Sequence, residues 1–325
     1  MTFTNPKRLG ALVLLAVFAM GACSGGGATA APATNGGGSL SGTVTNDGSS
    51  TVYPITEAVA EEFQIANPGV QAPSSLSGTG GGFQKFCRGE TDTNGASRPI
   101  KIDDEAEGVA CEANGVEWVE LQVAIDGLSV IVHPDNAFAT CLTVDELNAI
   151  FGPDAPETLL WSDVRPDFPS AEVNRFMPGA DSGTFDYFTE EISGETGAAT
   201  RYATQSEDDN TLVTGVAGDV NAIGYFGYAY FVENEDKLKA VEVDGGDGCV
   251  APTPETINGG TYTPLSRPLF IYPDVGKARE RPELKGFIDF YLANTSVLAA
   301  EVGYIAMPDD LLAAEIAEWE GALGN

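Results

Sequence analysis

Hydroxyl groups and free backbone N–H groups gather at one predicted helix start, around Asp181, Ser182 and Thr184. Apolar residues at helical spacing follow them, beginning with Phe185 and Phe188. The first N–H groups of a helix have no partner within the helix, and the helix dipole favours negative charge there. Such a start can hold a small anion, although at a single helix an ordinary Ser or Asp cap is the more frequent reason for these residues.

The same pattern recurs at two other places, and this recurrence favours a binding site. Residues 48–54 read Gly-Ser-Ser-Thr-Val-Tyr-Pro and residues 77–83 read Ser-Gly-Thr-Gly-Gly-Gly-Phe. The second segment is not a dinucleotide-binding fingerprint, because Phe83 stands at the third glycine position, and it lacks the Gly-Lys-Ser/Thr of a P-loop. Three hydroxyl-rich helix starts therefore predict an anion site built from separate turns.

Helical and strand patterns alternate along most of the chain. Ile55, Val59 and Phe63 repeat at helical spacing, and residues 123–132 form a nearly continuous apolar strand interrupted at Asp126 and Gly127. This alternation predicts an α/β architecture with ligand contacts at the turns from strand to helix.

The segments divide into two lobes joined by two crossings. The break at Asp126 and Gly127 marks the first crossing, and the apolar strand 267–272 is the expected return. We predict one lobe from residues 44–127 and 264–325 and a second lobe from residues 128–263, with the ligand between them.

Charge excludes some partners. The chain of 325 residues has 16 Lys and Arg against 48 Asp and Glu, a net charge of -32, so neither nucleic acid nor an anionic membrane surface is expected as its main partner. An anion would have to be held by local dipoles, and most of the acidity is explained by a solvated surface.

The N-terminus has the features of a targeting segment. Lys7 and Arg8 precede an apolar run, residues 9–20, that is too short to span a bilayer, and small residues lead to Cys23. This resembles the lipobox of bacterial lipoproteins, with Met20 where Leu is usual. The resemblance implies a signal peptide over residues 1–22, lipidation of Cys23, a flexible tether over residues 23–43 and a position outside the cytoplasmic membrane.

Four cysteines remain after Cys23: Cys87, Cys111, Cys141 and Cys249. An even number in an oxidising compartment predicts disulfides. The sequence leaves the pairing open, although a bridge between Cys87 and Cys111 would close a local loop and leave Cys141 for Cys249. No metal site is expected, because the chain has no C-x-x-C spacing and a single histidine, His133.

Five segments in this order and spacing resemble the phosphate-binding protein of the bacterial high-affinity phosphate ABC transporter. They are residues 48–54, residues 78–82, residues 95–100 (Gly-Ala-Ser-Arg-Pro-Ile), residues 181–185 (Asp-Ser-Gly-Thr-Phe) and residues 222–225 (Ala-Ile-Gly-Tyr). The resemblance implies a two-lobed periplasmic-binding-protein (clamshell) fold. It also implies a monomer without cofactor or catalysis that binds inorganic phosphate and delivers it to the permease subunits of an ABC transporter.

Carried over by position, the resemblance implies a set of phosphate-binding residues: Ser50, Thr51, Val52, Thr79, Arg98, Ser182, Gly183 and Thr184. Two positions depart from the usual pattern. Arg98 stands where many members have the aspartate that accepts the proton of hydrogen phosphate, and Pro178 stands where an arginine is usual. Arg98 is therefore expected to supply the cationic contact. Glu207 or Asp208 is the alternative proton acceptor, although carboxylates on a solvated loop are the simpler explanation for these two residues.

Two other functions fit parts of the sequence. A serine hydrolase or phosphatase would use Ser182, but His133 is the single imidazole base and residues 179–183 miss the G-x-S-x-G elbow by one place. A surface adhesin or phosphate-sensing protein would use the same fold.

Overall fold

The computed structural model describes residues 39–102, 107–180 and 182–324. The predicted signal peptide, Cys23 and most of the predicted tether lie outside these residues, as does Asp181. The last two residues of the predicted tether, Gly42 and Thr43, form a strand of the folded body.

Helices and strands alternate, as predicted. The helices are α1 Tyr53–Ala66, α2 Gly78–Phe86, α3 Glu107–Ala113, α4 Val144–Phe151, α5 Trp161–Val164, α6 Gly183–Ser193, α7 Asp209–Ala217, α8 Tyr228–Val232, α9 Pro254–Asn258, α10 Val275–Glu280, α11 Pro282–Glu301 and α12 Asp309–Leu323. The strands are β1 Gly42–Thr43, β2 Asn46–Gly48, β3 Val70–Gln71, β4 Thr93–Ala96, β5 Leu121–Val132, β6 Cys141–Thr143, β7 Asn174–Pro178, β8 Thr204–Ser206, β9 Ala222–Gly227, β10 Lys239–Ala240, β11 Glu242–Asp244, β12 Cys249–Val250 and β13 Ser266–Pro273.

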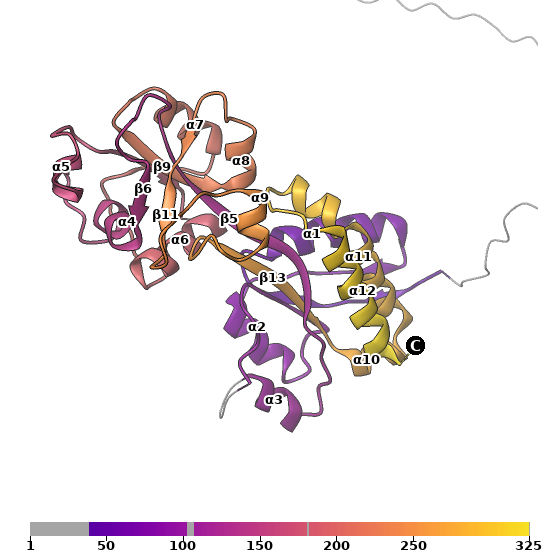
Figure 1. The fold of residues 1–325 in the computed structure, drawn as a ribbon. Helices are drawn as coiled ribbons and strands as arrows, with labels where there is room; N and C mark the ends of the chain where they lie inside the picture. The colour runs from indigo at the N-terminus through magenta and orange to yellow at the C-terminus, as the bar shows by residue number, and fades with distance from the viewer. Residues whose placement is uncertain (1–38, 103–106, 181, 325) are drawn as a thin grey trace, which may run out of the picture. The chain divides into compact units, whose positions relative to one another are not determined.

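Strand β5 is shared by two groups of strands. Its first part pairs antiparallel with β13, and its second part pairs antiparallel with β9. The strand order is β2-β4-β13-β5-β9-β7-β8, with β10 on the end of β5. Figure 1 shows β5 and β13 running between the helices α1, α10, α11 and α12 and the helices α4 to α8. The predicted crossings are therefore these two strands, although β5 continues through Asp126 and Gly127 without the expected break.

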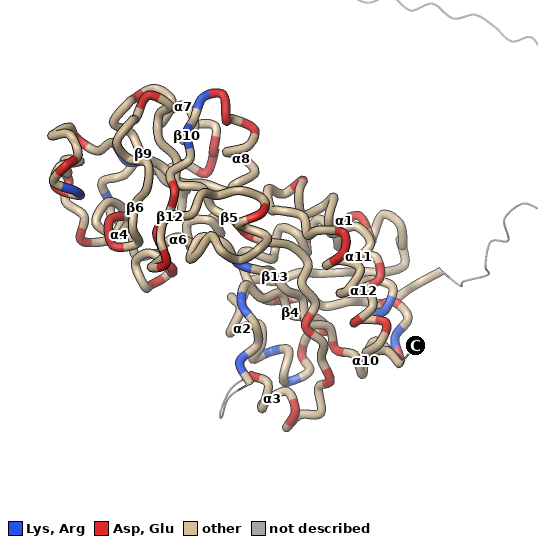
Figure 2. Tube along the Cα trace, in the orientation of Figure 1, with Lys and Arg blue, Asp and Glu red and all other residues tan. Residues whose placement is uncertain are grey.

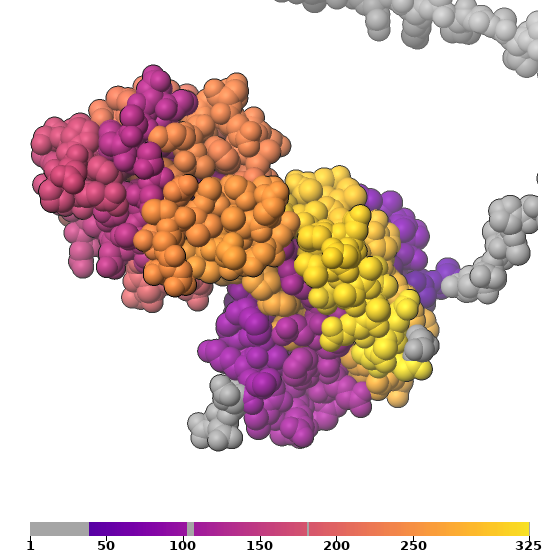
Figure 3. Space-filling view, viewed as in Figure 1, coloured from indigo at the N-terminus to yellow at the C-terminus, as the bar shows by residue number. Residues whose placement is uncertain are grey.

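Two main hydrophobic cores lie at the two ends of the crossing strands. One holds Phe63 of α1, Leu121 of β5 and Phe287 of α11, and the other holds Val130 of β5, Phe188 of α6 and Tyr225 of β9. In Figure 3 the indigo beginning and the yellow end of the described chain lie in one mass, while the middle of the chain forms the other. The fold is thus a two-lobed α/β fold.

The local sequence explains the two helices that matter most for the site. In α1, the predicted residues Ile55, Val59 and Phe63 are buried on one face, and proline stands in the first turn, where its missing N–H costs nothing. In α6, Phe185 and Phe188 are buried, and Ser182 is the N-cap. Both helices begin directly after a strand of their own lobe.

The glycine-rich segment is part of a helix instead of an open loop. Residues 78–82 form the first turn of α2, which packs closely on β2 and β4. A Cβ atom on Gly82 would lie 2.0 Å from Asn94 Oδ1 and 2.6 Å from Gly48 Cα, so Gly82 permits close packing of the helix on the sheet.

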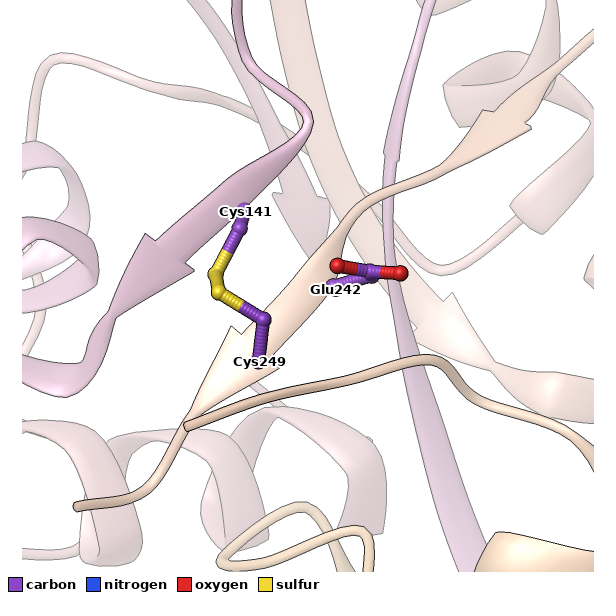
Figure 4. A group of neighbouring side chains, drawn as sticks. All are labelled: Cys141, Glu242 and Cys249. Carbon is purple, nitrogen blue, oxygen red and sulfur yellow. A yellow bond between two sulfur atoms is a disulfide. The ribbon is translucent and has the colours of Figure 1, made fainter. Parts of the chain in front are cut away.

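Both disulfides join the cysteines as the local-loop pairing predicted. Cys87 bonds to Cys111, and Cys141 bonds to Cys249. Glu242 lies beside the second bridge (Figure 4), but the two sulfur atoms are already bonded to each other, so this group of three has no thiolate to offer a metal.

Within the described part of the chain, no helix combines the length and the apolar character needed to cross a membrane.

Candidate functional site

One cavity of about 480 Å³ contains residues from both lobes. From one lobe it is lined by Ser50, Thr51 and Thr79, and from the other by Asp186 and Tyr187 of α6. Ser50 Oγ lies 3.4 Å from Asp186 Oδ2, a hydrogen bond that links the two lobes. We call this space cavity A.

Thr79 and Arg98 lie in cavity A, each with partners of its own. Thr79 Oγ1 lies 3.1 Å from Ser97 Oγ and accepts a hydrogen bond from the Ser97 backbone. Arg98 donates to both oxygens of Glu107, at 2.7 and 2.9 Å. Burial raises the pKa of Glu107, but its hydrogen bonds to Arg98 and to the Lys101 backbone more than offset this, and the pKa ends below its ordinary value. The guanidinium of Arg98 is thus already neutralised by a carboxylate.

The start of α6 lines a second, smaller cavity of about 290 Å³, which we call cavity B. Ser182, Gly183 and Thr184 face it together with Asp126 and Asp209. Ser182 Oγ accepts a hydrogen bond of 3.2 Å from the Thr184 N–H, as an N-cap does. The sequence analysis predicts that groups at this helix start bind an anion.

A residue that lines cavity B lies against a residue that lines cavity A. A Cβ atom on Gly183 would lie 3.3 Å from Thr51 Cα and 3.5 Å from Thr51 Oγ1, so the start of α6 lies directly against the turn that precedes α1. A larger residue than glycine would separate the two. The structure therefore places the start of α6, which lines cavity B, against Thr51, which lines cavity A with Ser50 and Thr79.

Val52 takes a different position from its predicted neighbours. Its side chain is fully buried in the core, and the residue is the N-cap of α1. Any contact of Val52 with a ligand would come from its backbone N–H, as its hydrophobic side chain also implies.

A second arginine lies in cavity A, and the sequence analysis missed it. Arg267 on β13 donates a hydrogen bond of 2.8 Å to Thr51 Oγ1 and lies opposite Asp126 in the strand register. The sequence analysis predicts an apolar strand for its segment. The available signal is one basic residue at the start of the strand 267–272 and one acidic residue within the strand 123–132.

The charges around the two cavities are mixed. Cavity A contains Arg98, Lys101 and Arg267 but also three carboxylates, those of Asp186, Glu190 and Glu191. Figure 2 shows Lys and Arg at separate places, including the regions around α2 and α10, among Asp and Glu that are spread over the described chain. Local contacts, not a broad positive surface, must therefore attract an anion.

Of the two acids named as alternative proton acceptors, Glu207 has the better position. It lines cavity B, and a Cβ atom on Gly179 would lie 1.7 Å from its Oε1, so a side chain at residue 179 would displace it. Asp208 is exposed and caps α7 by accepting from the Asn210 N–H. Its neighbour Asp209 lines cavity B, where burial, with help from Asp208 and Glu207, raises its pKa to about 6.

The two residues of the hydrolase hypothesis make contacts that serve local structure. Ser182 caps α6, and His133 Nδ1 accepts a hydrogen bond from the Asp135 backbone just after β5. Neither contact activates a nucleophile, which would need a base at the serine hydroxyl.

The fold and the site define a class of protein. Two lobes joined by crossing strands, with N–H groups and hydroxyls facing each other between them, are the features of a periplasmic-type binding protein with a polar interlobe site. The sequence model of the PBP superfamily domain matches residues 33–295.

Comparison with known proteins gives the family. The protein SphX of Synechocystis sp. is 49% identical over 262 residues, which cover 80% of this chain and 77% of SphX. The phosphate-binding protein PstS of Staphylococcus saprophyticus is 39% identical over 303 residues, covering 93% and 90% of the two chains. The crystal structure of a possible phosphate-binding protein from Planctomyces limnophilus matches with a TM-score of 0.83 and 48% identity, over 88% of this chain and all of the other. This chain belongs to the PBP superfamily and, within it, to the family of PstS-type phosphate-binding proteins.

Proposed function

We propose that this protein binds inorganic phosphate outside the cytoplasmic membrane and delivers it to an ABC-type phosphate permease. The supporting observation is the contact between the turn at Thr51 and the start of α6 at Gly183, because it joins anion-binding groups from both lobes. The family relationship to proteins named for phosphate binding supports the same ligand.

The proposed ligand contacts are the residues that the sequence analysis named. Thr51, Thr79, Ser50, Ser182 and Thr184 offer hydroxyls, and Val52 and Gly183 offer backbone N–H groups. Arg98 lines cavity A together with Ser50, Thr51 and Thr79. Neutral donors of this kind can hold an anion without a positive field over the whole surface, which explains how a chain of net charge -32 can bind phosphate.

Binding is expected to couple to closure of the lobes. Because donors come from both sides, an anion is fully coordinated when the lobes are closed, and the ligand shifts the equilibrium toward that state. The closed form would be the one that docks on the permease. The lipid anchor at Cys23 would hold the protein at the membrane as a monomer.

Calorimetric titration against a panel of oxyanions tests the ligand. We expect one phosphate per chain and sulfate binding at least tenfold weaker, about 1.4 kcal/mol, because sulfate lacks the proton that a buried acceptor would receive. Arsenate, which carries the same proton, should compete with phosphate. Equal affinity for sulfate would contradict the proposed ligand, and absence of phosphate binding would contradict the proposed function.

A further inference from the structure

A cross-strand ion pair lies on the two strands that connect the lobes. Arg267 of β13 stands opposite Asp126 of β5 in the register of the sheet. Both are largely enclosed, because the Arg267 side chain is 12% exposed and the Asp126 side chain 4%. Burial raises the pKa of Asp126, and the neighbouring arginine opposes this. Charged groups this deep in a protein are costly unless they are paired, so the pair is expected to have a role.

The pair lies between the two cavities. Asp126 lines cavity B beside Ser182 and Gly183, and Arg267 lines cavity A beside Thr51. The guanidinium therefore lies next to the contact at which the proposed ligand groups of both lobes meet.

The contacts of Arg267 fix the orientation of its guanidinium plane but leave its N–H groups able to donate to a ligand. The guanidinium carbon lies 3.5 Å from the centre of the Tyr187 ring, whose hydroxyl donates to the Pro264 carbonyl. The hydrogen bonds from Nε and Nη2 to Asp126 Oδ2 are both 3.4 Å, longer than the roughly 2.7–2.9 Å of a strong charge-assisted bond. Nη1 lies 3.9 Å from a carboxylate oxygen of Glu190, whose side chain is 58% exposed.

Arg98 has less hydrogen-bonding capacity left for an anion than Arg267. It already forms two short hydrogen bonds with Glu107, so an anion that used it would have to compete with a carboxylate. Arg267 can instead shift the donors that Asp126 holds at 3.4 Å to an anion at Thr51 without losing its stacking on Tyr187.

We propose that Arg267 supplies the main cationic contact to the bound oxyanion, with Asp126 and Tyr187 as positioning residues that orient its guanidinium. This inference rests on the proposed function. It places the cation of the site on a crossing strand, whereas the sequence analysis expected it at Arg98.

Calorimetry with inorganic phosphate on four proteins tests the proposal: the wild type, Arg267→Lys, the double variant Asp126→Asn/Arg267→Gln, and the comparison variant Arg98→Gln. Lysine keeps the charge opposite Asp126 but loses the planar fork, and the double variant removes both charges so that none is left unpaired. We expect phosphate affinity to fall at least tenfold in Arg267→Lys, further in the double variant, and by a smaller factor in Arg98→Gln than in Arg267→Lys.

Thermal unfolding of each variant without ligand separates binding from folding. A role confined to structure would lower the melting temperature of Arg267→Lys and leave its phosphate affinity unchanged, and that result would overturn the inference. A tenfold loss in Arg98→Gln with wild-type affinity in Arg267→Lys would overturn it as well. If the double variant does not fold, the phosphate affinity of Arg267→Lys alone tests the inference. Failure of the wild type to bind phosphate would instead refute the proposed function.

Discussion

Individual residues at the boundary of the lobes determine what the site can bind. Gly183 permits the start of α6 to lie against Thr51, and Glu207 lies in the space that a side chain at Gly179 would fill. The sequence predicted the hydroxyl residues because each belongs to a local motif at a helix start. It did not predict Arg267, because the role of that residue depends on its pairing with Asp126, 141 residues earlier in the chain.

Asp209 leads to a prediction about pH. Its pKa is raised to about 6, so the folded protein binds more protons than the unfolded chain between about pH 4 and pH 6, and stability from this group falls as the pH rises through that range. We expect Asp209→Asn to unfold at higher urea than the wild type at pH 7 and at nearly the same urea at pH 4. The gain should be about 1 kcal/mol after allowance for solvent screening and for the favourable dipole at the start of α7.

Urea unfolding of the phosphate-free protein at the two pH values measures this effect. Asp310→Asn is the matched control, because Asp310 is an exposed acid in the first turn of α12. An equal gain in both variants would show that general charge repulsion, and not the environment of Asp209, sets the stability.

At the scale of helices and strands, α6 combines a structural cap with the proposed anion site, and α4 offers a comparison. Ser182 caps α6, while Thr143 and Glu146 form a capping box at the start of α4. Alanine at either cap should cost about 1 kcal/mol of stability. We expect Ser182→Ala to weaken phosphate binding at least tenfold in addition, whereas Thr143→Ala should leave the affinity within about twofold of the wild type.

Chemical unfolding together with calorimetry distinguishes the two roles. Wild-type affinity in Ser182→Ala, with the stability loss present, would show that this hydroxyl caps the helix without contacting the ligand.

Elements with a strong local signal were predicted well, and elements defined by distant partners were not. Apolar residues at helical spacing identified α1 and α6. The strand expected over residues 267–272 is one residue longer at each end in β13, Ser266–Pro273, because strand ends depend on the neighbours available for pairing. The predicted break in β5 is absent, since pairing with β13 on one part and β9 on the other keeps the strand continuous.

At the scale of the molecule, the two crossing strands carry both the connection and the charge pair between the lobes. Arg267 and Asp126 lie on these strands, so a ligand that engages Arg267 acts on the segment about which the lobes must move. The two-lobed arrangement followed from the family resemblance and from the alternation of elements. The contact between Thr51 and Gly183 followed from neither, because it depends on the packing of two lobes that are distant in sequence.

A crystal structure grown with inorganic phosphate is the most direct test of the interlobe site. We predict one tetrahedral anion that accepts hydrogen bonds from the Thr51 hydroxyl in one lobe, from the Gly183 N–H or the Thr184 hydroxyl in the other, and from the Arg267 guanidinium. An anion bound to one lobe alone and away from these groups, or an interlobe cleft that holds no anion at saturating phosphate, would contradict the account.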